Sequence, residues 1–345
     1  MNAEELRIIE IVNSVLNVFF RYIIPVFYAV ATIGNAISAM IFFKKSWRKN
    51  VCVFYFRVSL LYSTFYINTV LLGSIFISGY QINLLNSSIF LCKFYFYTAF
   101  LSSTIYPSTL ILASVDRLLI SSQNVDTRLY SSKRLAYFLI SISTAIWMIY
   151  FLHLIIMTNI QQFGYGFVQC YYDLSANYLQ FVSYSSAVIN GSFSVAMIIL
   201  SIVASKNVRQ IRARPRNQRQ QQLRSMNKKD FQLLQCLYIQ DILYIVFSLF
   251  ISTVMVYNAA SSNNQQTPIQ NMLTNIGTML IHVPFCSSFF IFVSASKNFR
   301  QEVKRIILKF IGKNTALPRE EEEKPVQTQQ NVLQVNVVSA DHMPA

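Results

Sequence analysis

The sequence predicts an all-α membrane protein, a seven-transmembrane helix bundle followed by a short amphipathic eighth helix. Two observations predict this fold: seven apolar stretches are long enough to cross a bilayer, and the basic residues between them fall almost entirely on one side. A spanning helix needs about 20 apolar residues, because about 30 Å of hydrocarbon is covered at about 1.5 Å per residue. The composition agrees, since 54% of the residues are hydrophobic and 12% are charged, against about 25% charged in a soluble domain.

One bundle and two tails are expected. Residues 1–21 form an extracellular segment, whose apolar residues recur at helical spacing and predict a stretch that lies on the outer surface or extends the first helix. The bundle covers residues 22–296. Its predicted spans are 22–43, 52–78, 90–116, 135–157, 178–204, 231–257 and 269–295.

A surface helix and a tail follow the seventh span. One helical face of residues 297–312 is apolar, and basic residues lie on or beside the other face. This pattern is typical of a helix on the cytoplasmic membrane surface. Residues 313–345, rich in glutamine and glutamate, are predicted to be a disordered cytoplasmic tail.

The basic residues predict the orientation. Of the 29 lysines and arginines, 25 lie in residues 44–51, 117–134, 205–230 and 296–345. Because basic residues are retained on the cytoplasmic side during insertion, we expect a multi-pass plasma-membrane protein with its N-terminus extracellular and its C-terminus cytoplasmic. The net charge of +15 could also indicate nucleic-acid binding. Topology and the anionic inner leaflet explain the charge, so membrane lipids are expected as partners and nucleic acid is not.

Cys92 and Cys170 are predicted to form a disulfide. Cys92 lies at the outer mouth of the third span and Cys170 in the outer loop 158–177, so both face the oxidising compartment. The remaining cysteines fall inside spans or at their inner ends: Cys52, Cys236 and Cys286. A bond would tie the loop over the bundle; the alternative is two unpaired thiols. The sequon at Asn86 lies on the same side and predicts glycosylation.

The third span ends in Asp116-Arg117-Leu118, about 37 Å of helix after Cys92. Here the sequence resembles the rhodopsin-like (class A) G-protein-coupled receptors, whose third helix begins at a disulfide cysteine and ends in an Asp-Arg-Tyr type motif. Further matches follow in order across most of the chain: Gly34-Asn35, Trp147, Cys170, Lys229-Asp230 and Phe299-Arg300.

The chain also departs from this family. The second-helix aspartate falls at Tyr62 or Ser63, so the sodium-binding carboxylate is missing. The sixth-helix Cys-Trp-x-Pro element becomes residues 247–250 without a proline. The seventh-helix Asn-Pro-x-x-Tyr element becomes residues 288–292, ending in Phe292, with Pro284 about one turn earlier. The resemblance is therefore to a divergent member.

The resemblance implies a switch at the inner ends of the helices. Arg117, held by Asp116 and reaching Asp230, would keep helices three and six together until an agonist favours a state with helix six swung outward. Arg117 would then meet a heterotrimeric G protein. The alternative is that the Asp-Arg pair is merely interfacial. An intramembrane acid such as Asp241 is a functional candidate by default, although a structural hydrogen bond would also explain it. The predicted switch residues are Asp116, Arg117, Asp230, Asp241, Pro284 and Phe292.

A ligand would bind between the outer halves of the helices, under the tethered loop. The candidate pocket residues are Tyr95, Tyr97, Ala99, Phe100, Tyr171, Tyr172, Asp173, Tyr257 and His282. Ala99 stands where amine receptors of the family hold an aspartate, and His282 where opsins hold the retinal lysine. The resemblance therefore implies an extracellular peptide or a small non-aminergic chemical, with a peptide slightly favoured.

Other functional classes find less support. Phe163-Gly164-Tyr165-Gly166 looks like part of a potassium-filter sequence, but it lies in an outer loop and not at membrane depth. The alternative is nevertheless an ion channel or transporter-like membrane protein without G-protein coupling. The histidines and carboxylates form no motif such as His-Glu-x-x-His, so the sequence predicts no enzyme, no catalytic residues, no metal and no cofactor.

Overall fold

A computed structural model describes residues 3–48, 50–121, 131–163, 167–173, 175–213, 228–260 and 268–312. The chain divides into a unit that ends at Val303 and a second unit from Lys304 onward. The predicted seven-helix fold is confirmed, because seven helices of the described residues are long and apolar enough to cross a membrane. These are Glu10–Phe42, Val51–Gly79, Ile89–Ile120, Lys133–Met157, Asn177–Asn207, Phe231–Ala260 and Met272–Ala295.

The first membrane helix begins well before residue 22, so the apolar lead-in extends it. Its parts are α1 (Ala3–Val18), the π-helical turn η1 (Phe19–Ile23) and α2 (Ile24–Phe42). Pro25 is the second residue of α2, two positions after the end of η1. Since proline has no N–H for the carbonyl four residues earlier, a wider turn lets the helix continue through this position. The second helix also contains π-helical turns and consists of α4 (Val51–Tyr66), η2 (Ile67–Leu71), α5 (Leu72–Ser74) and η3 (Ile75–Gly79).

The five remaining membrane helices are simpler. They are α6 (Ile89–Ser121), α8 (Lys133–Tyr150) with its continuation α9 (Leu152–Met157), α10 (Ala176–Ala213), α12 (Lys228–Ala260) and α13 (Pro268–Ala295). Short elements lie in two connections: α3 (Lys45–Arg48) after the first helix and the 3-10 turn η4 (Leu84–Ser87) after the second.

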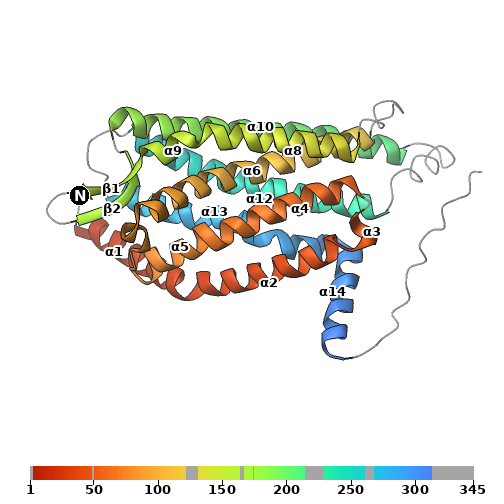
Figure 1. Cartoon of the computed structure of the whole chain (residues 1–345), viewed down its shortest axis with the longest axis horizontal. Coiled ribbons are helices and arrows are strands. Elements are labelled where there is room, and N and C mark those ends of the chain that lie inside the picture. The colour runs from red at the N-terminus through yellow and green to blue at the C-terminus, as the bar shows by residue number, and fades with distance from the viewer. Residues whose placement is uncertain are drawn as a thin grey trace, which may run out of the picture. The chain divides into compact units, whose positions relative to one another are not determined.

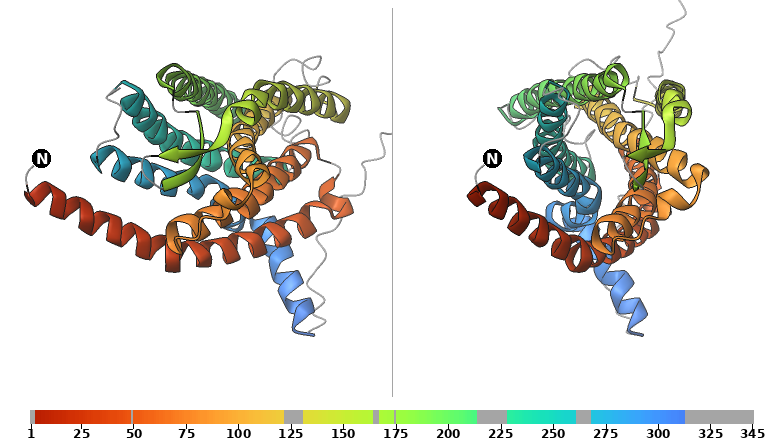
Figure 2. Two further views of the ribbon diagram at one scale, coloured as in Figure 1. Left: turned by 60° about the vertical axis from the view of Figure 1, so that its left-hand side comes forward. Right: turned by 90° about the vertical axis from the view of Figure 1, so that its left-hand side faces the viewer.

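The third membrane helix is the centre of the bundle (Figures 1 and 2). The helix α6 packs against α4, α8, α10 and α12, and α13 packs against α12 and α2. In the most apolar 18-residue stretch of the third helix, 67% is buried, whereas the corresponding value is 17% for both the fourth and the fifth helix. Large apolar side chains of the fourth and fifth helices, such as Ile156 and Val188, are instead exposed. In a bilayer these faces would contact lipid tails.

A β-hairpin crosses one end of the bundle, where loop 158–177 was predicted. The strands β1 (Thr158–Phe163) and β2 (Phe167–Tyr172) pair antiparallel, with Thr158 opposite Tyr172 and Ile160 opposite Cys170. The predicted disulfide is confirmed, since Cys170 is bonded to Cys92 at the start of α6. We call this the disulfide end; α3 and the C-terminal end of α6 lie at the opposite end, the Asp-Arg end (Figure 1). Gly164, Tyr165 and Gly166 lie outside the described residues.

The predicted eighth helix is α14 (Lys297–Phe310). Phe299 is buried and its ring lies 5.7 Å from Phe42, 6.3 Å from Trp47 and 5.4 Å from Phe292 between centroids. Lys44 forms an ion pair with Glu302. The start of α14 is therefore fixed to the connection between the first and second helices.

Candidate functional site

Asp116 and Arg117 form a buried ion pair at the Asp-Arg end. Each is 4% exposed. The Nη2 and Nε atoms of Arg117 donate to Oδ2 of Asp116 at 2.7 and 3.2 Å, and the Ser131 hydroxyl donates to Oδ1 at 2.6 Å. The hydrogen bonds to Asp116 thus orient the Arg117 guanidinium. The predicted contact of Arg117 with Asp230 involves a side chain outside the described part of the structure.

A second buried carboxylate joins the third and sixth helices. Asp241 of α12 is 1% exposed. The Ser114 hydroxyl of α6, one turn before Arg117, donates to Oδ2 of Asp241 at 3.3 Å. The other carboxylate oxygen, Oδ1, is buried and has no hydrogen-bond partner among the described residues. Asp241 therefore faces the bundle, as the cost of a carboxylate in hydrocarbon requires, and it lies against the helix that carries Arg117.

A polar network beside this contact was not predicted from the sequence. The Tyr106 hydroxyl of α6 lies 3.2 Å from the carbonyl oxygen of Pro284, to which it donates, and 3.4 Å from the Ser288 hydroxyl. The Gln240 amide of α12 donates to the same Ser288 hydroxyl at 3.1 Å. These bonds connect α6, α12 and α13 at Pro284. Because proline has no N–H, the carbonyl four residues before Pro284 lacks its usual N–H partner within the helix. Gln240, a polar residue within an apolar span, was the available signal.

Phe292 belongs to an inner aromatic cluster with Phe42, Trp47, Phe56 and Phe299. Its ring centroid lies 5.0 Å from both Phe42 and Phe56, edge to face. Edge-to-face pairs of this kind each contribute about 0.5–1.5 kcal/mol beyond their buried area. The cluster closes the Asp-Arg end between the first, second and seventh helices. A movement of the C-terminal part of α13, which carries Phe292, would therefore disrupt this aromatic cluster.

The structure distinguishes the two positions proposed for the missing second-helix aspartate. The Asn35 amide donates to the hydroxyls of Ser63 and Thr64 at 3.3 and 3.1 Å, and Ser63 donates to the Phe285 carbonyl at 2.8 Å. The Tyr62 hydroxyl lies instead 3.4 Å from that of Thr144 on α8. Ser63 is thus the one of these two residues that lies beside Asn35, to which it presents a neutral hydroxyl.

At the disulfide end, Tyr171 and Tyr172 pack in an aromatic cluster with Phe96 and Phe100. Tyr172 lies edge to face with both phenylalanines at centroid distances of 5.7 and 6.4 Å. Burial raises the pKa of both tyrosines, and the neighbouring Tyr171 raises that of Tyr172 further. Both hydroxyls therefore stay neutral. Asn86 fixes the adjoining strand, because its Oδ1 accepts from the Cys170 N–H at 2.7 Å and its amide donates to the Val168 carbonyl. Its glycosylation stays a prediction.

Other predicted pocket residues lie on α6 and α12 or beside β2. The Tyr97 hydroxyl donates to the Met148 carbonyl of α8 at 3.2 Å, and Asp173 accepts from the N–H and hydroxyl of Ser175 at 2.9 and 3.1 Å. Tyr257 is 48% exposed. Tyr95 and Ala99 are partly buried on α6. Tyr97 also packs, with Phe100 and Tyr171, against the hydrophobic cluster that contains Tyr172. The ligand pocket at the disulfide end stays a prediction.

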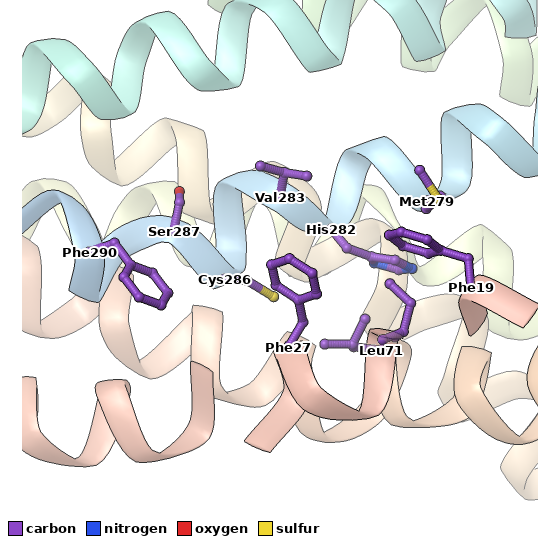
Figure 3. Close-up of a pocket in the computed structure, with 10 residues that line it drawn as sticks. Phe19, Phe27, Leu71, Met279, His282, Val283, Cys286, Ser287 and Phe290 are labelled. Atoms are coloured by element: carbon purple, nitrogen blue, oxygen red, sulfur yellow. The ribbon is translucent and has the colours of Figure 1, made fainter. Parts of the chain in front are cut away.

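His282 lines a cavity of about 130 Å³ between the first, second and seventh helices (Figure 3). Its buried floor includes His282, Leu71 and Cys286, whereas Phe27 and Phe290 at the rim are about half exposed. The other lining residues are Phe19, Ile24, Met279, Val283 and Ser287. The cavity is therefore almost wholly apolar and opens sideways, toward the surface that faces lipid in a membrane.

His282 supplies a polar group to the floor of this cavity. The Tyr66 hydroxyl lies 2.9 Å from Nδ1 of His282, and Nε2 is buried without a partner among the described residues. In the tautomer in which the Tyr66 hydroxyl donates to Nδ1, the imidazole proton lies on Nε2. Nε2–H is then a donor without an acceptor, at the floor of an apolar cavity.

The chain was compared with known proteins. A family model described as "7 transmembrane receptor (rhodopsin family)" matches residues 34–288. The match runs from Gly34-Asn35 to the part of α13 that contains Pro284 and covers well over half of the sequence. A search of curated proteins finds no match. The chain belongs to the rhodopsin family of seven-transmembrane receptors.

Proposed function

We propose that this chain is a plasma-membrane G-protein-coupled receptor that binds an extracellular ligand and activates a heterotrimeric G protein. The observation that carries the proposal is the buried Asp116–Arg117 pair at the inner end of the central helix α6, in a member of the rhodopsin family. A buried, oriented guanidinium at a membrane boundary is costly unless it has a partner or a function.

The proposed orientation puts the Asp-Arg end in the cytoplasm. The cysteines of the disulfide lie at the opposite end, as an oxidising exterior favours. The segments that hold 25 of the 29 basic residues connect or follow the helices at the Asp-Arg end. Both arguments support an extracellular N-terminus and a cytoplasmic C-terminus.

The contact between α6 and α12 supports a switch at this end. Ser114 and Asp241 hold the two helices together one turn above Arg117. A single hydrogen bond of this kind contributes about 0.5–1.5 kcal/mol, which is within reach of the differential binding energy of a ligand. Outward movement of α12 would break it and open space beside Arg117 for a G-protein segment.

The cavity at His282 supports a small uncharged ligand over a peptide. Its volume of about 130 Å³ is close to that of an engineered apolar cavity that holds benzene, about 150 Å³. In the tautomer that carries its proton on Nε2, His282 favours a ligand with one hydrogen-bond acceptor, such as a ketone, ester or alcohol. Such a molecule partitions into the bilayer and can enter through the lateral opening between Phe27 and Phe290.

Nucleotide exchange tests the receptor function. The full chain in lipid nanodiscs should accelerate GDP release from at least one heterotrimer in a panel of G proteins. Arg117→Ala should lower this rate by about tenfold, the effect of one lost charge-assisted contact. Arg134→Ala, at an exposed position at the start of α8, should leave it within about twofold.

The alternative membrane functions give a different result. If no G protein in the panel responds and the same preparation carries ionic current in a planar bilayer, the chain is a channel. To test the ligand site, small ketones and a peptide library should be screened on wild type and Val283→Phe, which fills the cavity. A response to peptides that is unchanged in Val283→Phe would contradict the proposed site.

A further inference from the structure

We propose that a cavity at the Asp-Arg end binds the phosphorylated headgroup of an anionic phospholipid. The cavity measures about 270 Å³ and is lined by Arg48, Phe54, Arg57, Lys133 and Tyr137. The proposal goes beyond the receptor function and rests only on the proposed orientation, which puts this end at the cytoplasmic leaflet.

Three cations reach this cavity from three different elements. Arg48 comes from α3, which lies at the Asp-Arg end (Figure 1). Arg57 comes from α4 and Lys133 from the first turn of α8, and both line the same cavity as Arg48. The topology rule explains why basic residues lie on this side. It does not explain why they converge on one cavity, nor why Arg57 lies about 9 Å inside its helix.

The three cations lack a counter-ion in the described part of the chain. None of their side chains takes part in an ion pair or hydrogen bond with another described residue. The Nε atom of Arg57 is buried and without such a partner. None of the lining residues carries a negative charge. Mutual repulsion of the cations and the unpaired Nε–H both favour an anion in the cavity.

The chemistry of the lining suits a phosphate. The guanidinium carbon of Arg57 lies 5.2 Å from the Phe43 ring centroid and 5.5 Å from that of Phe54. These rings hold the planar group, whose parallel N–H donors match two phosphate oxygens. Phe54 also packs against the Tyr137 ring at 4.1 Å, so the Tyr137 hydroxyl is available as a neutral donor at the rim.

The start of α8 adds to the positive potential. The Ser132 side chain accepts from the Leu135 N–H and caps this 18-residue helix. The positive end of the helix dipole therefore lies beside Lys133 and favours an anion there. Three cations around one cavity favour a headgroup with several negative charges, a phosphoinositide, over the single charge of phosphatidylserine.

Lipid binding to the full chain in nanodiscs tests the proposal. Wild type should bind phosphatidylinositol 4,5-bisphosphate at least about tenfold more tightly than phosphatidylserine presented at equal total charge. The triple variant Arg48→Gln, Arg57→Gln, Lys133→Gln should lose roughly 100-fold, since each cation contributes about fivefold. A control triple, Lys206→Gln, Arg209→Gln, Arg212→Gln, removes the same charge elsewhere and should retain affinity within about fivefold.

Two further variants test the same proposal if the triple variant does not fold. Arg48 and Lys133 are exposed, so the pair Arg48→Gln, Lys133→Gln should fold and lose roughly 25-fold. Arg57→Lys retains the positive charge but lacks the planar guanidinium with its parallel N–H donors, so its affinity for the lipid should be lower. An equal loss in the test and control triples would overturn the proposal, because it would show diffuse attraction. If inositol trisphosphate or inorganic phosphate binds the cavity as tightly as the lipid does, the ligand is a soluble phosphate and the proposal of a lipid headgroup is contradicted.

Discussion

At the scale of single residues, the buried carboxylate of Asp241 is the most informative group. It lies inside the bundle against Ser114 of the central helix, and its second oxygen has no partner among the described residues. A polar group in this environment is retained against its desolvation cost. Its partner Ser114 lies one helical turn before Arg117, so the contact is next to the proposed switch.

Removing this contact should raise the basal activity of the receptor. Asp241→Ala and Ser114→Ala each abolish the bond between α6 and α12, so the open state should gain population by about tenfold. The measurement is ligand-free nucleotide exchange in nanodiscs. The double variant should show no more than the larger single effect, because both changes remove one interaction.

Thr109→Ala provides the control for this prediction. Thr109 is also a buried hydroxyl of α6, but it donates at 2.9 Å to the Ile105 carbonyl of its own helix. Its removal should leave basal exchange unchanged. Basal rates that rise equally in all three single variants, or in none, would show that the Ser114–Asp241 contact does not hold the helices together.

Sequence reasoning located single residues better than their surroundings. Asp116, Arg117 and Asp241 stood out because charges are costly in hydrocarbon, and each is buried. His282 was found through the family resemblance, yet it lines a lateral cavity away from Tyr171 and Tyr172. The direction of a side chain around a helix depends on tertiary packing, which spacing along one chain does not determine.

At the scale of elements, the π-helical turns of the first two helices allow a close approach at the disulfide end. An added Cβ at Gly79 in η3 would lie 2.9 Å from the Phe20 carbonyl oxygen in η1. The backbones therefore touch where only glycine fits. Hydropathy predicted both helices but not these turns, because a π-helical turn changes no residue type and leaves apolar content unchanged.

Gly79→Ala should destabilise the protein, whereas Gly191→Ala should not. The first adds a methyl group against backbone that cannot rotate away, at a cost of about 1–3 kcal/mol. The second lies within α10 with no atom within 4 Å of the added Cβ, so its better helix propensity should stabilise by up to about 1 kcal/mol. Thermal unfolding in detergent measures both. A Gly79→Ala protein as stable as Gly191→Ala would contradict the close contact.

The hairpin over the disulfide end was also beyond sequence reasoning. Cys170 predicted the tether, but Thr158–Phe163 and Phe167–Tyr172 were expected only as a loop. Their alternation of polar and apolar residues is weak. The two hydrogen bonds between Asn86 and β2 are non-local contacts that spacing along the sequence does not reveal.

At the scale of the whole molecule, one central helix connects the two functional ends. The helix α6 starts at the disulfide and ends at Asp116–Arg117, and its burial exceeds that of every other membrane helix described. The seven helices were predictable because hydrocarbon thickness fixes the length of an apolar span. In the proposed mechanism, α12 moves relative to this central helix when a G protein binds.

Distance measurement between spin labels tests that movement most directly. Labels at exposed positions, Gln235→Cys on α12 and Arg134→Cys on α8, report on the Asp-Arg end, and a pair at Lys45 and Arg134 serves as a static reference. With a nucleotide-free G protein bound, the distance between Gln235 and Arg134 should lengthen by several ångströms while the reference pair stays constant. If neither distance changes although the G protein is bound, opening of the sixth helix is not the mechanism.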